Sequence, residues 1–148
     1  MEFKNKNLLD DSNFMAGKNM VIHICNVMGK WGRGFVLPLS KKWKDTREKY
    51  IKLAEYELGH VQYVEVADNI VVANMICQHG INIKNQTIDR VDYDALHKCL
   101  IDISNRYGDE FTIHMPKIGC GLACGNFEKI LELIQCDLRK FKKIMYII

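Results

Sequence analysis

Apolar residues in this chain gather in short runs that have the length of β-strands. Met20–Cys25, Val61–Val66 and Ile70–Ile76 are compact runs of this kind, so each predicts a strand. Asp68 and Asn69 separate the last two runs, and a polar pair between strands is typical of a hairpin. We therefore expect the last two strands to be antiparallel neighbours.

Longer stretches between these runs have the spacing of amphipathic helices. Residues from Val36 to about Tyr56 predict a helix with Pro38 in its first turn, where the missing proline N–H costs little. A second helix follows Asp92, because Tyr93–Tyr107 carries apolar residues three and four positions apart. A third begins after Asn126, which can cap it. The expected inner face of the first helix consists of Leu39, Trp43, Tyr50 and Leu53.

Two further strands complete the alternation of strands and helices. Phe111–Met115 precedes the third helix, and Lys143–Ile148 follows it. The stretch from His79 to Arg90 predicts an irregular connection. Strands that alternate with helices indicate an α/β fold with helices on both sheet faces. A length of 148 residues is usual for one domain, so we expect residues 1–148 to form a single domain.

Composition and charge exclude several classes of protein. The apolar share of 48% supplies a core and argues against disorder. The 21 Lys and Arg residues against 18 Asp and Glu give a net charge of +3, which is no strong nucleic-acid signal. No apolar run approaches the roughly 20 residues of a membrane helix, and the first residues form no apolar signal core. Six cysteines are too few for a disulfide scaffold, so a reduced, cytoplasmic protein is expected.

Two glycine loops are the main candidates for chemistry. Gly119–Gly125 lies between a predicted strand and a predicted helix, where free N–H groups and the helix dipole favour an anion such as phosphate. Its spacing is GxGxxxG, whereas a dinucleotide-binding turn has the spacing GxGxxG. We therefore reject the interpretation of this loop as a dinucleotide-binding turn. Gly29–Gly34 also follows a strand and precedes a helix. Because ligands of such sheets bind at the carboxyl ends of strands, the two loops together predict a site for a pyrophosphate or two anionic groups.

Several polar residues lie beside these loops. His23 and Asn26 stand at the end of the strand that enters the first loop, and His79 follows another strand. A histidine there can act as a general acid or base, and an asparagine can bind a sugar hydroxyl. The alternative for His23 is a buried, hydrogen-bonded side chain, for Asn26 a turn residue, and for His79 a loop residue.

The cysteines allow two further interpretations. Cys120 and Cys124 are separated by three residues, but no matching pair or histidine cluster follows at zinc-site spacing, so no metal and no cofactor are expected. Cys120 lies where a helix dipole favours a thiolate, which leaves a nucleophilic cysteine open.

Three blocks of the sequence resemble the ADP-ribose-binding macrodomain family. His23–Asn26 and Gly29–Gly34 are similar to the branch of the ADP-ribose 1''-phosphate phosphatase, and Met115–Leu122 is similar to the terminal ADP-ribose glycohydrolase branch. The resemblance covers nearly the whole chain. It implies a three-layer α/β/α sandwich around a central mixed β-sheet, with ADP-ribose or a derivative as the ligand.

The resemblance also implies a role for each block. Asn26 would hold the distal ribose, Gly29–Gly34 would wrap that ribose and a phosphate, and Gly119–Gly125 would cradle the pyrophosphate. Asn7 stands where many macrodomains carry an Asp that binds adenine. The implied ligand-binding residues of the two loops are Gly29, Trp31, Gly32, Arg33 and Gly34 in the first, and Ile118, Gly119, Cys120, Gly121, Leu122 and Ala123 in the second.

One departure from the family pattern affects the expected reaction. The glycohydrolase branch uses a Lys from the central strand region and an Asp after its Gly-Cys-Gly-Leu motif. Here Asn74–Gln78 contains no Lys, and Ala123 occupies the second position. We therefore expect hydrolysis of a group from the distal ribose, with ADP-ribose 1''-phosphate as substrate, His23 as general acid or base and His79 as a second candidate. The alternatives are a non-catalytic ADP-ribose-binding module and a hydrolase that acts on an ADP-ribosylated protein or nucleic acid.

Overall fold

A single mixed sheet organises the part of the chain that the computed structural model describes, which is residues 1–80, 91–118 and 126–147. The strands are β1 (Glu2–Lys4), β2 (Lys18–Asn26), β3 (Val61–Ala67), β4 (Ile70–Gln78), β5 (Phe111–Pro116) and β6 (Lys142–Tyr146). Their order in the sheet is β1-β6-β5-β2-β4-β3. All neighbours are parallel except β3 and β4, whose antiparallel pairing makes the sheet mixed.

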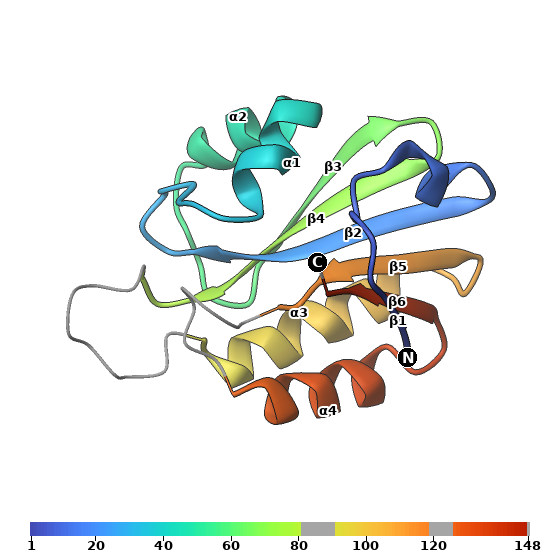
Figure 1. Ribbon diagram of the computed structural model, residues 1–148. Coiled ribbons are helices and arrows are strands. Elements are labelled where there is room, and N and C mark those ends of the chain that lie inside the picture. Colours follow the sequence, from blue (N-terminus) through green and yellow to red (C-terminus); the bar gives the residue numbers. More distant parts are fainter. Residues whose placement is uncertain (81–90, 119–125, 148) are drawn as a thin grey trace.

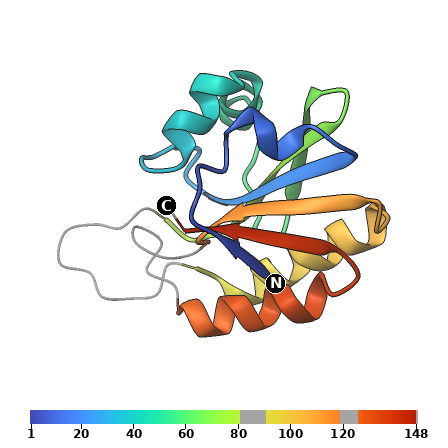
Figure 2. The ribbon, with the colours of Figure 1, turned by 45° about the vertical axis from the view of Figure 1, so that its right-hand side comes forward.

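Helices cover both faces of this sheet. They are α1 (Val36–Lys42), α2 (Asp45–Ile51), α3 (Tyr93–Arg106) and α4 (Phe127–Asp137), and a short 3-10 helix η1 spans Asp11–Phe14. Figures 1 and 2 show α1 and α2 on one face and α3 and α4 on the other. The expected three-layer α/β/α sandwich is confirmed. Within the described residues, no helix has the length and apolar character needed to cross a membrane.

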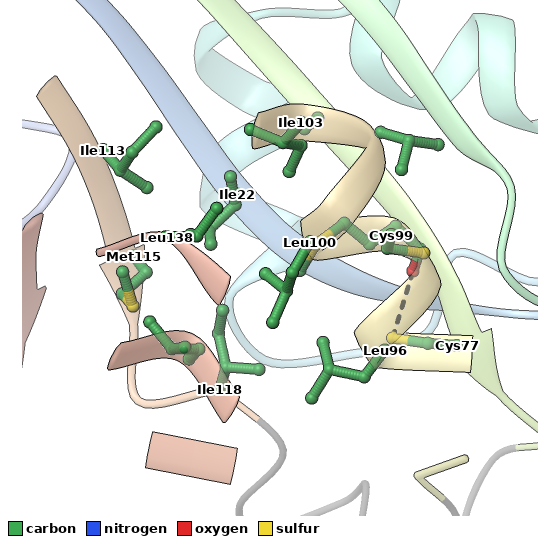
Figure 3. Close-up of a cluster of buried hydrophobic side chains, with 14 of the residues drawn as sticks. Ile22, Cys77, Leu96, Cys99, Leu100, Ile103, Ile113, Met115, Ile118 and Leu138 are labelled. Carbon is green, nitrogen blue, oxygen red and sulfur yellow. Dashed lines mark hydrogen bonds between the residues drawn. The ribbon is translucent and has the colours of Figure 1, made fainter. Parts of the chain in front are cut away.

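Strand β2 supplies both cores because its side chains alternate between the two faces. Met20 and Ile22 point to the α3 and α4 layer, whereas Val21 and Cys25 belong to the core under α1 and α2. Figure 3 shows the first of these cores, where side chains of α3 meet side chains of β2 and β5. The residues labelled there include Leu96, Leu100 and Ile103 of α3, Ile22 of β2, and Ile113 and Met115 of β5. Residues spaced three and four apart on α3 thus form its buried face, as the sequence predicts.

Several local predictions are confirmed. The Asp92 side chain accepts a hydrogen bond from the Ala95 N–H at 2.8 Å, and the Asn126 side chain accepts one from the Lys129 N–H at 3.2 Å. Both residues therefore cap their helices as expected. The β3–β4 hairpin forms around the predicted turn at residues 68–69.

The single helix predicted from Val36 to Tyr56 is wrong. The chain leaves the helical conformation at Trp43, whose φ of −130° and ψ of 90° separate α1 from α2. The Thr46 hydroxyl donates to the Trp43 carbonyl at 2.7 Å, and the Trp43 ring packs against Phe14 with 5.7 Å between centroids. These contacts favour the break, so Leu53 of the predicted inner face lies beyond the end of α2.

The N-terminal strand β1 was not predicted. It has only three residues and carries Glu2 and Lys4, so no apolar pattern marks it. It forms because its backbone pairs with β6, which places it at an edge of the sheet. The predicted closing strand Lys143–Ile148 is observed as Lys142–Tyr146, and the irregular connection predicted up to Arg90 lies mostly outside the described residues.

A buried histidine ties β5 to β2 and β6. The His114 Nε2–H donates to Asn19 Oδ1 at 2.8 Å, since the Asn19 amide nitrogen donates elsewhere, and His114 Nδ1 accepts from the Tyr146 hydroxyl at 2.8 Å. Burial lowers the pKa of His114 to about 4, and the nearby Lys4 and Lys142 act in the same direction. The neutral ring is therefore the form that fits the folded protein.

We expect this histidine to make the protein less stable in mild acid. His114 binds a proton near pH 6.5 in the unfolded chain but only near pH 4 in the folded protein. Its contribution to the free energy of unfolding is therefore fully present above pH 6.5 and is lost as the pH falls toward 4. The loss between pH 6.5 and pH 5 is about 1.5 kcal/mol for this group. Urea unfolding at several pH values measures it, and a His114→Gln variant with the same pH dependence as the native protein would contradict the assignment.

Candidate functional site

The carboxyl ends of four parallel strands meet at one edge of the sheet. Strands β2, β4, β5 and β6 end at Asn26, Gln78, Pro116 and Tyr146. Because neighbouring parallel strands run in the same direction, the segments that leave these ends lie on one side of the molecule. The predicted first glycine loop leaves β2 here and leads into α1 (Figure 2).

A hollow of about 370 Å³ opens at this edge. Four separate parts of the chain enclose it: the segment after β1, the start of α1, the end of β5 and the end of β6. Its lining residues are Asn7, Leu8, Leu9, Gly34, Phe35, Pro38, Pro116, Lys117, Tyr146 and Ile147. Two predicted ligand residues, Asn7 and Gly34, thus lie on one concave surface although they are far apart in sequence.

Asn7 begins a tight turn at the edge of this hollow. Its Oδ1 accepts the Leu9 N–H at 3.0 Å, and its carbonyl accepts the Asn13 amide at 2.9 Å. The Asn7 side chain is exposed, and its Nδ2 has no hydrogen-bond partner among the described residues. The group that Asn7 offers a ligand most freely is therefore an N–H donor, together with the second lone pair of Oδ1.

Three glycines shape the first loop. Gly29, Gly32 and Gly34 have φ values of 71°, 81° and 83°, which residues with a side chain rarely adopt. A Cβ at Gly29 would also lie 2.7 Å from the Tyr56 ring, whereas Gly32 and Gly34 face open space. The backbone of this loop is therefore free to approach a ligand at Gly32 and Gly34.

Asn26 holds this loop to the end of β2. Its Oδ1 accepts the Met28 N–H at 2.9 Å and the Tyr50 hydroxyl at 2.9 Å, and its Nδ2 donates to the Lys30 carbonyl at 2.7 Å. The Tyr50 hydroxyl lies 2.6 Å from the Asn26 carbonyl as well. Asn26 thus has the turn role that the sequence left open, and its predicted contact with a ribose remains a prediction.

Trp31 fixes the other end of the loop. The side chain is buried, and its indole N–H donates to the Val36 carbonyl at 2.8 Å and to Ser40 Oγ at 3.1 Å. Its ring packs against Tyr50 with 5.5 Å between centroids. Trp31 therefore attaches the loop to α1 through its side chain, and Arg33 beside it is exposed.

His23 lies inside the protein, beneath the loop. Its side chain is 2% exposed, between the rings of Trp31 at 5.5 Å and Phe35 at 6.0 Å. The ring Nε2–H donates to Asn74 Oδ1 at 2.5 Å, because the Asn74 amide nitrogen donates to the Thr46 carbonyl. Burial lowers the pKa of His23 to about 4, so the ring is neutral at pH 7. His23 therefore offers almost no surface to a substrate in this structure.

His79 is the predicted catalytic histidine that solvent reaches. Its side chain is 54% exposed, and its Nε2 lies 2.9 Å from Asp92 Oδ2. The other oxygen of Asp92 caps α3, so the carboxylate is held in place from two sides. The sequence indicates Asp92 only as a helix cap, whereas its pairing with His79 follows from the bridge that brings residue 91 beside residue 78.

The second glycine loop, Gly119–Gly125, lies outside the described residues. Gly119, Cys120, Gly121, Leu122 and Ala123 belong to the segment that the structure leaves undescribed. Ile118, the last described residue before it, is buried. Lys117 lines the hollow, and its ammonium group lies 4.6 Å from the Phe127 ring centroid. The predicted pyrophosphate cradle therefore remains a prediction.

The hollow is also lined by residues that the sequence did not predict. Phe35 and Pro38 follow the glycine loop directly, so the loop itself was a signal for them. Tyr146 and Ile147 carry no such signal, because only the pairing of β6 between β1 and β5 brings them to this edge.

The fold and the hollow together define an α/β protein with a concave surface at the carboxyl ends of parallel strands, which is where ligands of such sheets bind. No family model matches the chain, and no curated protein matches it. Solved structures do match. A protein of unknown function from Bacteroides thetaiotaomicron is 36% identical with a TM-score of 0.88, and the match covers 98% of this chain and 96% of that chain.

Two further structures come from proteins with a family name. A macrodomain protein from Streptomyces coelicolor is 29% identical with a TM-score of 0.81, and the match covers 99% of this chain and 98% of that chain. DarTG from Thermosipho africanus, solved in complex with ADP-ribose, is 16% identical with a TM-score of 0.66, over 86% of this chain and 37% of that chain. The last likeness is one of fold. This chain belongs to the macrodomain family.

Two alanine substitutions distinguish the two constraints on the glycines of the first loop, which are the positive φ and the close contact with Tyr56. Gly29→Ala and Gly32→Ala both place a side chain at positive φ, which costs about 1–2 kcal/mol. Only Gly29→Ala also displaces Tyr56, whose hydroxyl donates to the Tyr50 carbonyl at 2.9 Å. We expect Gly29→Ala to lower the free energy of unfolding in urea by about 1–3 kcal/mol more than Gly32→Ala.

A second background tests the cause of this difference. In a Tyr56→Ala protein, the ring that meets the new Cβ is absent, so Gly29→Ala should cost no more than Gly32→Ala. An excess cost that persists without the ring would show that the contact with Tyr56 is not its source.

Proposed function

We propose that this protein binds ADP-ribose at the carboxyl edge of its sheet. The observation that carries the proposal is the hollow of about 370 Å³, which brings Asn7, the end of the first glycine loop and the ends of β5 and β6 onto one surface in a macrodomain fold. The DarTG structure in complex with ADP-ribose supports it through a shared fold.

The lining of the hollow suits a purine base at one end of the ligand. Phe35, Pro38 and Ile147 supply apolar surface for the faces of the ring. Asn7 supplies a free N–H donor at the rim, and adenine carries ring nitrogens that accept hydrogen bonds. The backbone at Gly34 lines the same hollow, and the phosphates would follow along the glycine loop from there.

Calorimetric titration tests this assignment. The native protein should bind ADP-ribose more tightly than AMP or ribose 5-phosphate, because each control contains only part of the ligand. Phe35→Ala removes an aromatic wall and should weaken binding about tenfold, in line with about 1.5 kcal/mol for such a contact. Leu37→Ala is the matched control, since Leu37 lies in the first turn of α1, two residues after Phe35, but outside this hollow.

Two results would contradict the proposal. The absence of heat from the native protein at millimolar ADP-ribose would reject binding altogether. Equal affinities of Phe35→Ala and Leu37→Ala would place the ligand elsewhere.

We further propose that the protein hydrolyses a group from the distal ribose, with ADP-ribose 1''-phosphate as substrate. The position of the histidines favours His79 as general acid or base, since His79 is exposed and paired with Asp92 while His23 is enclosed. Asp92 would orient the His79 ring in such a reaction. The alternatives are a binding module without turnover and release of ADP-ribose from a modified protein or nucleic acid.

Single-turnover release of phosphate from ADP-ribose 1''-phosphate distinguishes these roles. His79→Ala should lower the rate at least 100-fold, the range typical of a general acid or base. Asp92→Asn keeps a side chain that caps α3 but removes the charge beside His79, so the rate should fall while the melting temperature changes little.

His23→Ala should mainly lower the stability of the protein. Tight ADP-ribose binding without phosphate release would favour the binding module, and loss of release only in His23→Ala would reassign the catalytic histidine.

A further inference from the structure

Positive charge is concentrated in one stretch of the chain. Residues 30–52 contain eight of the 21 basic residues and only two of the 18 acidic ones, so this stretch carries +6 and the remainder carries −3. The stretch spans the end of the first glycine loop, α1 and α2. The modest net charge of the whole chain therefore conceals a strongly basic segment.

Three of these cations line one surface hollow. Lys41 of α1, Lys44 between the helices and Arg47 of α2 lie around a hollow of about 430 Å³. All three side chains are exposed. Leu37, Ser40 and Glu48 complete the lining. We call this surface the basic face.

The three cations carry charge that described carboxylates do not neutralise. Lys42, their neighbour, pairs with Asp11 at 2.5 Å, whereas none of Lys41, Lys44 and Arg47 forms an ion pair with a described residue. Glu48 lines the same hollow without reaching any of them at ion-pair distance. The basic face thus keeps a net positive charge toward solvent.

Local helix stability does not explain two of these residues. Lys44 is the N-cap of α2, and Arg47 lies in its first turn. The N-terminus of a helix is its positive end, where acidic residues stabilise and cations destabilise. Lys41 lies in the last turn of α1, at the negative end of the helix dipole, where a cation is stabilising. Lys44 and Arg47 lie at the positive end of α2, where a cation is destabilising.

The basic face adjoins the candidate ADP-ribose site. Helix α1 contributes Pro38 to the site hollow and Leu37, Ser40 and Lys41 to the basic face, so one helix forms a wall of both. Arg33 of the glycine loop is also exposed, and it directly precedes Gly34, which lines the site hollow.

We propose that the basic face binds the phosphodiester backbone of a nucleic acid strand. Exposed, unpaired cations from two helices around a shallow hollow match a polymer that carries one negative charge per phosphate. The strand would run across α1 and past the rim of the site. This proposal is independent of ADP-ribose binding, because the two hollows share no lining residue.

Fluorescence anisotropy with labelled oligonucleotides tests the proposal. The probes are a 20-nucleotide oligothymidylate and a 20-base-pair duplex, which distinguish single-stranded from duplex sources of the same backbone. Contacts with about three phosphates predict that affinity for the single strand falls roughly 20-fold between 50 and 200 mM salt. The variant Lys41→Glu/Lys44→Glu/Arg47→Glu should bind at least tenfold more weakly than the native protein at 50 mM salt.

A matched variant controls for net charge. It changes three exposed cations on or next to the helices of the opposite layer, namely Lys98→Glu, Lys129→Glu and Arg139→Glu. This variant has the same net charge as the triple variant of the basic face and should bind nearly as well as the native protein. The triple variant should still fold, since glutamates at the start of α2 suit the helix dipole, and its thermal melting and ADP-ribose titration verify that.

Three outcomes would overturn the proposal. One is the absence of binding of the native protein to either oligonucleotide at 50 mM salt. Another is an equal loss in the two charge variants, which would indicate attraction by net charge alone. The third is competition by polyglutamate at the same charge concentration as effectively as by unlabelled oligonucleotide, which would indicate an acidic polypeptide as the partner.

Discussion

The hydrogen bonds between Tyr50 and Asn26 are the constraint on which the candidate site depends. They join the end of β2 to α2, and Asn26 in turn holds the loop through Met28 and Lys30. With the loop fixed at this end and attached to α1 by Trp31, the start of α1 is placed over the ends of β5 and β6. Tyr50, which is buried in the layer of α1 and α2, therefore helps to determine the position of the hollow at the carboxyl ends of the strands.

The sequence predicted the parts of the fold that local chemistry determines. Helices α3 and α4 have periodic apolar faces and side-chain caps at Asp92 and Asn126, so their starts could be read directly. Strand β1 forms only because its backbone pairs with β6, and no local pattern marks it. The break at Trp43 likewise depends on a distant partner, Phe14, which a pattern along the helix cannot show.

The candidate site shows the same division. The glycine loop after β2 could be predicted, because a strand followed by closely spaced glycines has a clear physical meaning. The state of each histidine could not. His23 and His79 both stand near strand ends, but His23 points into a layer closed by Trp31 and Phe35, whereas His79 faces solvent beside Asp92. Burial and partner distinguish them, and both arise from contacts between distant segments.

Helix α1 links the two surfaces that the structure presents. It is only seven residues long, yet Pro38 lines the site hollow and Leu37, Ser40 and Lys41 line the basic face. A short helix can serve both surfaces only if its ends are held from outside. Trp31 holds its start through the Val36 carbonyl and Ser40, and the chain break at Trp43 ends it. The break that the sequence did not reveal therefore lies within the basic face, whose cations come from α1 (Lys41), from the junction of the two helices (Lys44) and from α2 (Arg47).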